Sequence, residues 1–517
     1  MSRRSLRTIF AFCCVALLSS SAAAETRTVG AGKQHASLAE ALEVVAPGDV
    51  VEVYDDETYP TTGEGGAVAK RHGSPTGKIT IRGMKNAQGK RVKLSGGKQG
   101  ALFLQGNHYV VEGFEITNGT ETCVTLRAND VTIRDSVVHD CPRHGILALD
   151  EGMGSLTLEY VEVYKAGLEE EGQALKHPIY VSSDANPTTG FPGSVFRMEH
   201  CYVHDARDGN NVKSRAERNE IRFNWIEGAG YYELELIGPD LAQADVARHS
   251  EVIGNVFFKT NARSHMVRIG SDGSANSNGR YRFVNNTFIL SATTEGLLRA
   301  EQVIDSLEFT NNVGWRFGRS INSVFRRSET EWLKGTPRIS GANNWFPTGS
   351  EDVPEELEGT ILGGDPGFTS TSPLDLRPKA NGALADKGTA TSPSPEGAAF
   401  PNPFAIPPAF VPGQRAVPRA GSPLERPRSG APDIGAYEVG SDAPPGSAGA
   451  EEDQPAPGED PSAEDGDDDD DRTSGRGKTR DIGTCGCRFV GARGERAALA
   501  FGLAVVALAY ARRRRQG

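Results

Sequence analysis

Two short strand patterns that alternate along the middle of this 517-residue chain predict an all-β solenoid. In the first pattern one position is taken as equivalent from repeat to repeat. It recurs at intervals of 22 to 40 residues, at Gly113, Asp135, Tyr160, His200, Asn224, Asn255, Asn286 and Asn312. No helical crossover separates the strands. Repeats of this length made of strands alone are typical of a solenoid in which each repeat adds one coil.

A second strand type lies between members of the first, as in CVTLRA (123–128), NVKSRA (211–216) and ELELIG (233–238). Apolar and polar residues alternate in it with period two, which predicts a strand with one buried face. The longest interval is filled by SSDANPTTGFPG (182–193), which we expect to form a surface loop.

The N-terminal edge of the solenoid needs a cover, and the sequence predicts a helix there. Ser37 and Glu40 form a capping box, and Leu38 and Leu42 fall on one helical face. Pro47 ends the helix. We therefore expect a short amphipathic helix over the first coil.

The first 24 residues have the layout of a secretory signal peptide. Arg3, Arg4 and Arg7 precede an apolar run at 9–18, and small residues precede an expected cleavage after Ala24. The predicted organisation is a signal peptide at 1–24, a β-helix domain at 25–440, a linker at 441–484 and a tail at 485–517. The chain is therefore expected to be exported.

The linker is strongly acidic. Residues 441–471 hold 13 acidic residues and neither lysine nor arginine, which predicts a solvated spacer. The whole chain has a net charge of −12. A sequence-independent nucleic-acid binder is expected to be basic, so we expect no nucleic-acid partner. We also expect a monomer.

In the tail, Cys485 and Cys487 precede an apolar run at 497–511 and four arginines at 512–515. This resembles the myxobacterial-type C-terminal sorting signal, which implies sorting at the cysteine motif and display at the cell surface or outer envelope, with later release left open. A plain membrane anchor is the alternative, although the run is shorter than the roughly 20 residues of a full span. The arginine cluster predicts a cytoplasmic C-terminus.

Three cysteines remain in the body: Cys123, Cys141 and Cys201. Three is an odd number, so at least one stays unpaired or pairs elsewhere. A bridge between Cys123 and Cys141 across adjacent turns is one arrangement that an exported chain would allow.

From about residue 26 to 440 the chain resembles the right-handed parallel β-helix proteins of the pectate-lyase-like superfamily. The closing segments GGDPGF (363–368) and APDIGAYE (431–438) belong to this resemblance. It implies a right-handed parallel β-helix with a capping helix. The fold hosts lyases, hydrolases, epimerases and binding proteins, so the function must be argued from a site.

Stacking the second strand type by its inward residues predicts such a site. The inward row is Val124, Ile146, Ile179, Val212, Leu234 and Val267. The residues that follow them then share the outward face: Thr125, Leu147, Tyr180, Lys213, Glu235 and Arg268. Neighbouring strands lie about 4.8 Å apart, so these side chains would form one column, with Asn211 and Glu233 on one side of it and Arg215 on the other. A slip of one residue would turn all of them inward.

Cations on an outward strand face predict a groove for an anionic ligand, and a uronate polysaccharide is the best candidate. A uronate lyase removes the proton at C5 and expels the sugar on O4, so it needs a cation on the carboxylate and a base near C5. We assign Lys213 as the base, provided that its pKa is lowered. Arg215 and Arg268 are assigned as carboxylate clamps, and Tyr180 or His177 as the proton donor.

Acidic residues around the column suggest Ca²⁺ as a cofactor. Glu233 and Glu235, together with Asp205 or Asp208, could supply the oxygen ligands that this ion prefers. The stretch KSRAERNEIRFN is also similar to the KSxxNxxRxN pattern of β-helix alginate lyases. That resemblance implies a role for Arg222, with a spacing two residues longer than in the family.

Three alternatives stay open. Lys213 between glutamates could be a rung of a surface charge ladder in a non-catalytic glycan-binding or adhesion protein. A glycoside hydrolase would need two carboxylates, for which Glu233 and Glu235 are candidates. The repeated His139-Asp140 and His204-Asp205 pairs resemble acid/base dyads, but their repetition favours turns. The four asparagines of the first pattern are interpreted as a structural ladder.

Overall fold

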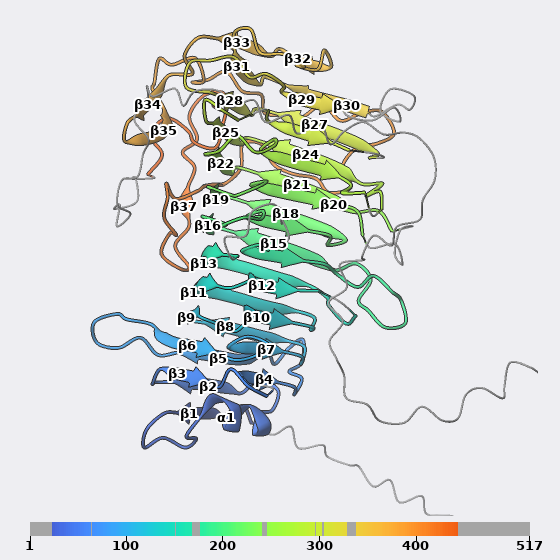
Figure 1. Cartoon of the computed structure of the whole chain (residues 1–517). Coiled ribbons are helices and arrows are strands. Elements are labelled where there is room, and N and C mark those ends of the chain that lie inside the picture. The colour runs from blue at the N-terminus through green and yellow to red at the C-terminus, as the bar shows by residue number, and fades with distance from the viewer. Residues whose placement is uncertain are drawn as a thin grey trace, which may run out of the picture. The chain divides into compact units, whose positions relative to one another are not determined.

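The structure is a computed structural model that describes residues 23–63, 65–149, 151–167, 176–239, 246–273, 275–294, 296–301, 304–327 and 338–442, all within one unit (Figure 1). The predicted signal peptide lies outside these residues, apart from its last two positions. Most of the linker and the whole tail also lie outside them. Within the described part no helix is long and apolar enough to cross a membrane.

The described chain is a parallel β-helix with three strands in most coils, which confirms the predicted fold class. The first strands of successive coils pair in parallel and form the first column. Its strands are β1 (Thr26–Val29), β2 (Val50–Val53), β5 (Ile79–Gly83), β8 (Tyr109–Glu112), the first halves of β11 (Val131–Cys141) and β13 (Leu156–Ala166), β15 (Val195–Glu199), β18 (Arg218–Arg222), β21 (His249–Ile253), β24 (Arg280–Val284), β27 (Ser306–Thr310), β30 (Arg338–Ala342) and β32 (Leu357–Glu358).

The second column follows after a bend in each coil and belongs to the same 23-stranded sheet. It contains β3 (Glu57–Tyr59), β6 (Val92–Gly96), β9 (Phe114–Thr117), the second halves of β11 and β13, β16 (Tyr202–His204), β19 (Trp225–Glu227), β22 (Val256–Lys259), β25 (Thr287–Leu290), β28 (Val313–Trp315), β31 (Trp345–Pro347) and β33 (Ile361–Gly363).

The third column is a separate ten-stranded parallel sheet and carries the predicted site. It contains β4 (Ala67–Ala69), β7 (Leu102–Leu104), β10 (Thr122–Leu126), β12 (His144–Ala148), β14 (Ile179–Val181), β17 (Val212–Ser214), β20 (Leu234–Ile237), β23 (Val267–Gly270), β26 (Leu298–Ala300) and β29 (Phe325–Arg327). Two antiparallel hairpins, β34 (Phe368–Thr371) with β35 (Leu374–Pro378) and β36 (Phe410–Val411) with β37 (Leu424–Glu425), follow the last coil.

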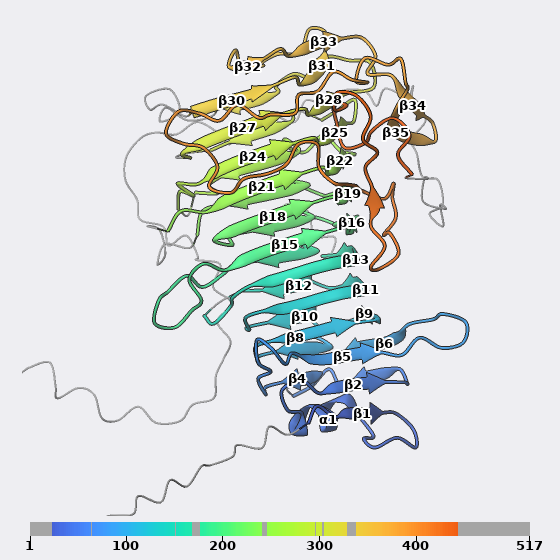
Figure 2. The ribbon, with the colours of Figure 1, turned by 180° about the vertical axis from the view of Figure 1, so that it is seen from behind.

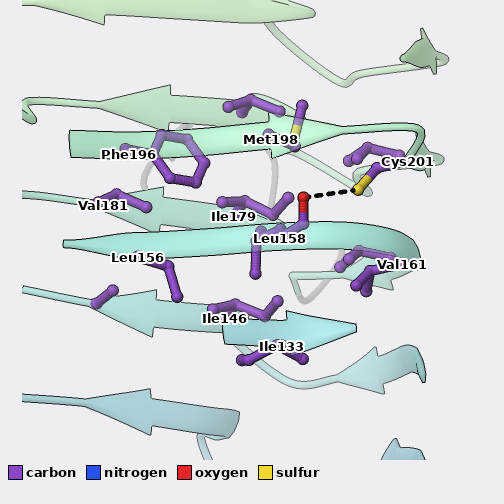
Figure 3. Close-up of a cluster of buried hydrophobic side chains, with 14 of the residues drawn as sticks. Ile133, Ile146, Leu156, Leu158, Val161, Ile179, Val181, Phe196, Met198 and Cys201 are labelled. Carbon is purple, nitrogen blue, oxygen red and sulfur yellow. Dashed lines mark hydrogen bonds between the residues drawn. The ribbon is translucent and has the colours of Figure 1, made fainter. Parts of the chain in front are cut away.

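Every second side chain of each strand points into the space between the columns and fills it, as the period-two alternation predicts. Ile146 pairs with Ile179, Ile179 with Val212 and Val212 with Leu234, which confirms the predicted inward row. All four side chains are fully buried. Figure 3 shows Ile146 and Ile179 packed against Leu158 of the facing sheet.

The N-terminal edge is covered by α1 (Leu38–Val44), as predicted. The Glu40 backbone N–H donates to the Ser37 hydroxyl at 3.3 Å, and the Glu40 carboxylate accepts from the Ala36 N–H at 3.0 Å. Leu38 and Leu42 are buried against the first coils. The helix therefore closes the apolar core at the end where no further coil follows.

An asparagine ladder lies at the bend between the first and second columns. The Asn224 backbone N–H donates to the side-chain oxygen of Asn255 at 2.9 Å, and the same bond joins Asn255 to Asn286 and Asn286 to Asn312. Asn344 extends the ladder by one coil. All these side chains are completely buried, so the ladder satisfies backbone donors that the bend leaves unpaired. The structural interpretation is confirmed.

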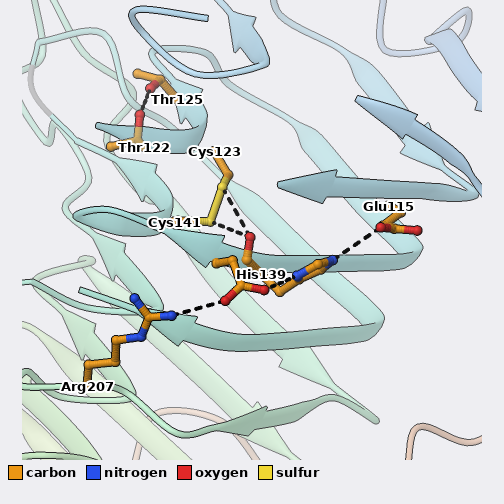
Figure 4. The surroundings of a disulfide bond; sticks show 8 residues. Glu115, Thr122, Cys123, Thr125, His139, Cys141 and Arg207 are labelled. Atoms are coloured by element: carbon orange, nitrogen blue, oxygen red, sulfur yellow. Dashed lines mark hydrogen bonds and ion pairs between the residues drawn. A yellow bond between two sulfur atoms is a disulfide. The ribbon is translucent and has the colours of Figure 1, made fainter. Parts of the chain in front are cut away.

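The structure pairs Cys123 with Cys141 in a disulfide between adjacent coils and leaves Cys201 free and buried (Figure 4). The His-Asp pairs lie at turns, as interpreted, because Asp140 and Asp205 have φ angles of 50° and 52°. The left-handed region suits turn residues such as Asp.

After the last coil the C-terminal segment (residues 366–438) folds back along the β-helix, as Figure 2 shows. Its apolar side chains pack on the second column, where Trp225, Trp345 and Tyr437 join one buried cluster. Among the described residues, this segment forms hydrogen bonds with the first column, the second column and the bends between them. Arg282 of the first column, for example, donates to the Asn402 carbonyl. The third column stays outside this cover.

Candidate functional site

The outward face of the third column has the predicted register. Tyr180 pairs with Lys213, Lys213 with Glu235 and Glu235 with Arg268. Their neighbours along the strands, such as Val212 and Ser214, are buried. Because strand side chains alternate between faces, the four residues form one column on the outward face of the sheet, where Glu235 is completely buried among its neighbours.

Lys213 lies between two carboxylates. Its Nζ is 3.1 Å from Glu235 Oε2 and 3.1 Å from Asp272 Oδ2, and 5.5 Å from the centre of the Tyr180 ring. Burial lowers the pKa of Lys213, but the charges of Glu235, Tyr180 and Asp272 outweigh it and raise the pKa above its ordinary value. The condition for Lys213 to act as base, a lowered pKa, is therefore not met, and Lys213 is held as an ammonium group.

Arg215 extends the cationic surface from the end of β17. Its Nε donates to the Tyr180 hydroxyl at 3.1 Å, one terminal nitrogen donates to the Gly238 carbonyl at 2.7 Å, and the other is ion-paired with Asp272. Only 6% of its side chain is exposed, so the guanidinium is held in one orientation. That orientation directs one of its hydrogen bonds at Tyr180 of the column.

Glu235 is completely buried between two cations, Lys213 and Arg268. Burial raises its pKa, but those two charges outweigh the burial and lower the pKa below its ordinary value. The Asn210 side chain also donates to Glu235 Oε2 at 2.7 Å. Arg268 in turn lies 4.8 Å from the centre of the Tyr232 ring. Glu235 is thus a buried counter-ion of the column.

Glu233 does not share the outward surface with Glu235, which corrects the prediction. It precedes β20 and turns into the bend between the second and third columns, where Asn211 Nδ2 donates to it at 2.6 Å and the Ala229 N–H at 2.9 Å. Complete burial raises the pKa of Glu233 to about 7. Asn211 is likewise fully buried, so neither residue is exposed to a ligand.

Two buried histidines, His144 and His177, lie next to Tyr180. The Asn210 N–H donates to His177 Nδ1 at 2.9 Å, and the His177 N–H donates to His144 Nδ1 at 3.1 Å. Both rings therefore carry their hydrogen on Nε2 when neutral. Burial, aided by Lys213, lowers the pKa of His177 well below its ordinary value. Burial and nearby cations lower the pKa of His144 to about 3.

Three predicted site residues lie elsewhere. Arg222 is on the first column, paired with Glu199 at 3.2 Å and with Glu220 at 3.4 Å. Asp205 accepts a hydrogen bond from Nδ1 of its neighbour His204 at 2.7 Å, and Asp208 is paired with Arg263 at 2.9 Å. Arg222 therefore cannot act with Lys213 in the arrangement that the alginate-lyase pattern implies.

The four proposed calcium ligands do not form one set. Glu233 and Glu235 bond to different partners, and Asp205 and Asp208 have partners of their own in the turns. In the described ranges no three His, Cys, Asp or Glu side chains are grouped so that they could hold a metal ion. The residues do not fit a calcium site, and no chemical step is derived through Ca²⁺.

Sequence reasoning missed Asp272, Arg299 and Arg326. Asp272 follows β23 in a loop, and no periodic pattern predicts where a loop returns to the sheet. Arg299 and Arg326 continue the outward column, in register with Arg268. The register that places Lys213 and Arg268 in the column, extended by two strands, would have found both arginines.

No protein-family model and no curated protein sequence matches the chain. The fold is similar to that of pectate lyase Pel9A, with 14% identity, 80% of this chain and 96% of that chain covered, and a TM-score of 0.51. An alginate lyase from Paenibacillus sp. str. FPU-7 has 18% identity, coverage of 58% and 98%, and a TM-score of 0.42. A rhamnogalacturonan lyase has 16% identity, coverage of 64% and 90%, and a TM-score of 0.42. At this identity the first likeness supports the parallel β-helix fold alone.

Proposed function

We propose that the third column binds an acidic uronate polysaccharide and cleaves it by β-elimination. The observation that carries the proposal is the concentration of Lys213, Arg215 and Arg268 on a sheet face that the C-terminal segment leaves uncovered, in a chain whose net charge is −12. An acidic protein repels a polyanion unless cations are gathered locally. The pectate, alginate and rhamnogalacturonan lyases of similar fold make the same substrate class a reasonable choice.

The electrostatics suggest an exchange of the roles first assigned to Lys213 and Tyr180. Lys213 is protonated and therefore carries a proton that it can deliver to the leaving oxygen, so we assign it as the acid. The Tyr180 oxygen accepts a hydrogen bond from Arg215 Nε at 3.1 Å. Because Lys213 is protonated, we assign Tyr180 as the base.

These groups can carry out both proton transfers of the elimination. The Tyr180 oxygen takes the proton at C5, and the electrons of the broken C–H bond form the C4–C5 double bond. The bond between C4 and the bridging oxygen breaks, and Lys213 protonates the leaving oxygen. Arg215 and Arg268 would hold the uronate carboxylate and neutralise the charge that develops beside C5. A neutral His177 packs edge-on against Tyr180 at 5.5 Å between ring centres and fixes its position.

A non-catalytic glycan-binding protein is the second candidate, because a specific observation favours it. Each of the three cations already has a carboxylate partner, Glu235 or Asp272, as in a structural charge network. A glycoside hydrolase finds less support, since Glu233 and Glu235 are both completely buried and bonded to separate partners.

Ultraviolet absorbance of the unsaturated product separates these candidates. The full-length protein is incubated with polygalacturonate, alginate and rhamnogalacturonan, with Ca²⁺ and with a chelator, and both absorbance and new reducing ends are followed. We expect an absorbance rise that Tyr180→Phe and Lys213→Ala abolish. Matched controls are Tyr164→Phe and Lys93→Ala, because Tyr164 and Lys93 lie on the second column. Both should keep full activity.

Other outcomes would each exclude one reading. A rise that persists in Tyr180→Phe and Lys213→Ala would place the chemistry outside the third column. Reducing ends without absorbance would indicate hydrolysis. Binding without either product would support the glycan-binding candidate. A rise that depends on Ca²⁺ would restore the metal as a cofactor supplied with the substrate.

We also propose that the chain is exported and displayed at the cell surface, on the sequence of residues 1–24 and 485–517 alone. Mass spectrometry of the mature N-terminus and fractionation of the producing cells test this. We expect the mature chain to begin after Ala24. A chain that retains residue 1 and stays in the cytoplasmic fraction would contradict the proposal.

A further inference from the structure

A loop aspartate joins the two cations of the third column that lie beside Tyr180. Asp272 follows the last residue of β23, Gly270, by two positions. Its Oδ2 lies 3.1 Å from Lys213 Nζ and also accepts from a terminal nitrogen of Arg215. Only 13% of the Asp272 side chain is exposed. One carboxylate oxygen therefore bridges two cations at β17 from a loop two strands away along the column.

The path of this loop is fixed where it leaves the sheet. Gly270 has a φ of 100°, and a Cβ at this position would lie 1.9 Å from a backbone carbonyl oxygen of the next coil, so only glycine fits. The Gly270 carbonyl accepts from the backbone N–H groups of Gly238 at 2.9 Å and Ser277 at 3.0 Å. Ser271, between Gly270 and Asp272, is completely buried. The turn therefore directs Asp272 back over the column in a defined position.

Asp272 and Glu235 both pair with Lys213, but they connect it to different groups. Glu235 lies on the neighbouring strand, completely buried, with its Oε2 3.1 Å from Lys213 Nζ. Asp272 joins Lys213 to Arg215, whose Nε donates to the Tyr180 hydroxyl at 3.1 Å. The proposed acid, Lys213, and the proposed base, Tyr180, are thus connected through Asp272 and Arg215. Asp272 therefore ties the position of the acid to the position of the base.

The negative charge of Asp272 also acts on the proton that Lys213 carries. The titratable and charged groups that face Lys213 are Glu235, Asp272, Tyr180, Arg215, His144 and His177. Burial lowers the pKa of Lys213, but Glu235, Tyr180 and Asp272 together raise it above its ordinary value, against the opposing charge of Arg215. Without the Asp272 charge the pKa of Lys213 should fall, because the charge of Arg215 would then be less compensated.

We propose that Asp272 is a positioning residue for the elimination, which holds the Lys213 ammonium group and the Arg215 guanidinium in one arrangement around the reacting sugar unit. The inference rests on the proposed function, because it takes Lys213 as the acid and Tyr180 as the base. Asp272 itself neither gives nor takes a proton in the reaction. Its carboxylate keeps two like charges side by side that would otherwise repel each other. A displacement of about 1 Å in such groups can slow a reaction roughly a hundred-fold.

The pH profile of kcat/KM tests this role, because it reports the ionising groups of the free enzyme. The full-length protein is assayed on polygalacturonate, or on whichever of the three polysaccharides gives the larger absorbance rise. We expect Asp272→Asn to lower kcat/KM about ten-fold at neutral pH and to move the alkaline limb, where Lys213 loses its proton, to lower pH. Asp272→Glu keeps the charge, so its alkaline limb should stay in place although its rate falls.

The matched control is Asp305→Asn. Asp305 also bridges two cations, Arg280 at 2.6 Å and Arg338 at 3.5 Å, but both belong to the first column. This variant loses the same charge and should keep the rate and the pH profile of the wild type.

A second measurement does not depend on catalysis. The rate at which acetic anhydride acetylates Lys213 across a pH series, followed by mass spectrometry of the peptide, reports the protonation of its amine. We expect this profile to move to lower pH in Asp272→Asn and to stay in place in Asp305→Asn.

The outcomes separate this inference from the proposed function. An Asp272→Asn protein with the wild-type rate would overturn the positioning role while the elimination stands. A lower rate with unshifted pH profiles would reduce Asp272 to a structural residue. Tighter binding and faster turnover would overturn the role as well, because Asp272 would then compete with the substrate carboxylate. If the wild type gives no ultraviolet signal on any of the polysaccharides, the proposed function fails and the positioning role with it. Circular dichroism confirms that each variant is folded.

Discussion

The first and third columns both carry charged residues on their outward faces, but they arrange them differently. On the first column Glu52, Arg82, Glu112 and Arg134 alternate in sign from coil to coil, and Arg82 and Arg134 both reach Glu112 at 2.6 Å. On the third column the run ends in three arginines, Arg268, Arg299 and Arg326. Alternation pairs the charges of a ladder with one another, whereas a run of one sign needs carboxylates from outside the run, and Glu301 after β26 supplies one to Arg268 and Arg299.

The two columns also differ in burial. Arg82 and Arg134 expose 41% and 46% of their side chains, while Lys213, Arg215 and Glu235 expose 11%, 6% and 0%. Exposed pairs contribute little to stability, but a buried charge that loses its partner is costly. The same residue types therefore form a solvated ladder in the N-terminal coils of the first column and a tightly coupled network on the third column.

The largest expected effect is the loss of the central counter-ion. Glu235→Ala leaves Lys213 and Arg268 without their shared carboxylate in a buried site, which should destabilise the fold by about 3–5 kcal/mol. Glu112→Ala, the equivalent on the first column, should cost about 1 kcal/mol or less. Chemical denaturation of the full-length variants measures both. Equal costs would remove the distinction between the two columns.

The contribution of Glu235 should also depend on pH in a defined direction. Its folded pKa lies below the ordinary value of 4.5, so its stabilisation is present above that value and is lost as the pH falls through the folded pKa. Lys213 has a raised pKa, so the stabilisation that its charge contributes is lost only as the pH rises above 10.5. The stability difference between wild type and Glu235→Gln should stay constant across neutral pH and shrink in acid. A difference that grows in acid would contradict the assignment.

Ligand binding should stabilise the third column and leave the first unaffected. A six-unit oligouronate at about 100 times its Kd should raise the free energy of unfolding by roughly 2.7 kcal/mol. At the same ligand concentration the increase should be smaller in Arg268→Gln and unchanged in Arg134→Gln. Thermal unfolding with and without ligand gives the comparison. An equal increase in all three proteins would mean that the ligand binds elsewhere.

The smallest effect is expected on the first column itself. Arg134→Gln removes one exposed partner of Glu112 and should change stability by less than about 1 kcal/mol, because water and salt already screen the pair. That small difference should vanish in concentrated salt. A large, salt-independent loss would show that the first column is also a coupled network, and the contrast between the columns would disappear.

Much of the fold follows from local patterns. The alternation in NVKSRA and ELELIG predicted the pairing of Lys213 with Glu235, and the capping box of Ser37 predicted where α1 begins. Both patterns act over a few residues and are dictated by strand and helix geometry. The equivalent asparagines predicted the ladder because a repeat that stacks on itself places equivalent residues together.

The predictions that were wrong concern residues outside the regular strands or their electrostatic surroundings. Glu233 lies one residue before β20 and turns into a bend, although the alternation assigns it to the outward face. Asp272 comes from a loop and, with Glu235, raises the pKa of Lys213, whereas the base role assigned to Lys213 requires a lowered one. Arg222 follows a family-like spacing but lies on another face of the coil.

By itself the sequence determined the repeating strands, their register and the column of cations, because side-chain alternation and stacking of equivalent residues are local properties. Tertiary structure alone decided which face stays open, since the C-terminal segment covers the other two columns through contacts more than a hundred residues apart in the chain, such as Arg282 with Asn402. It also decided the charge state of Lys213. A pKa depends on every charge and on the solvent around a group, and folding brings those charges together from separate coils.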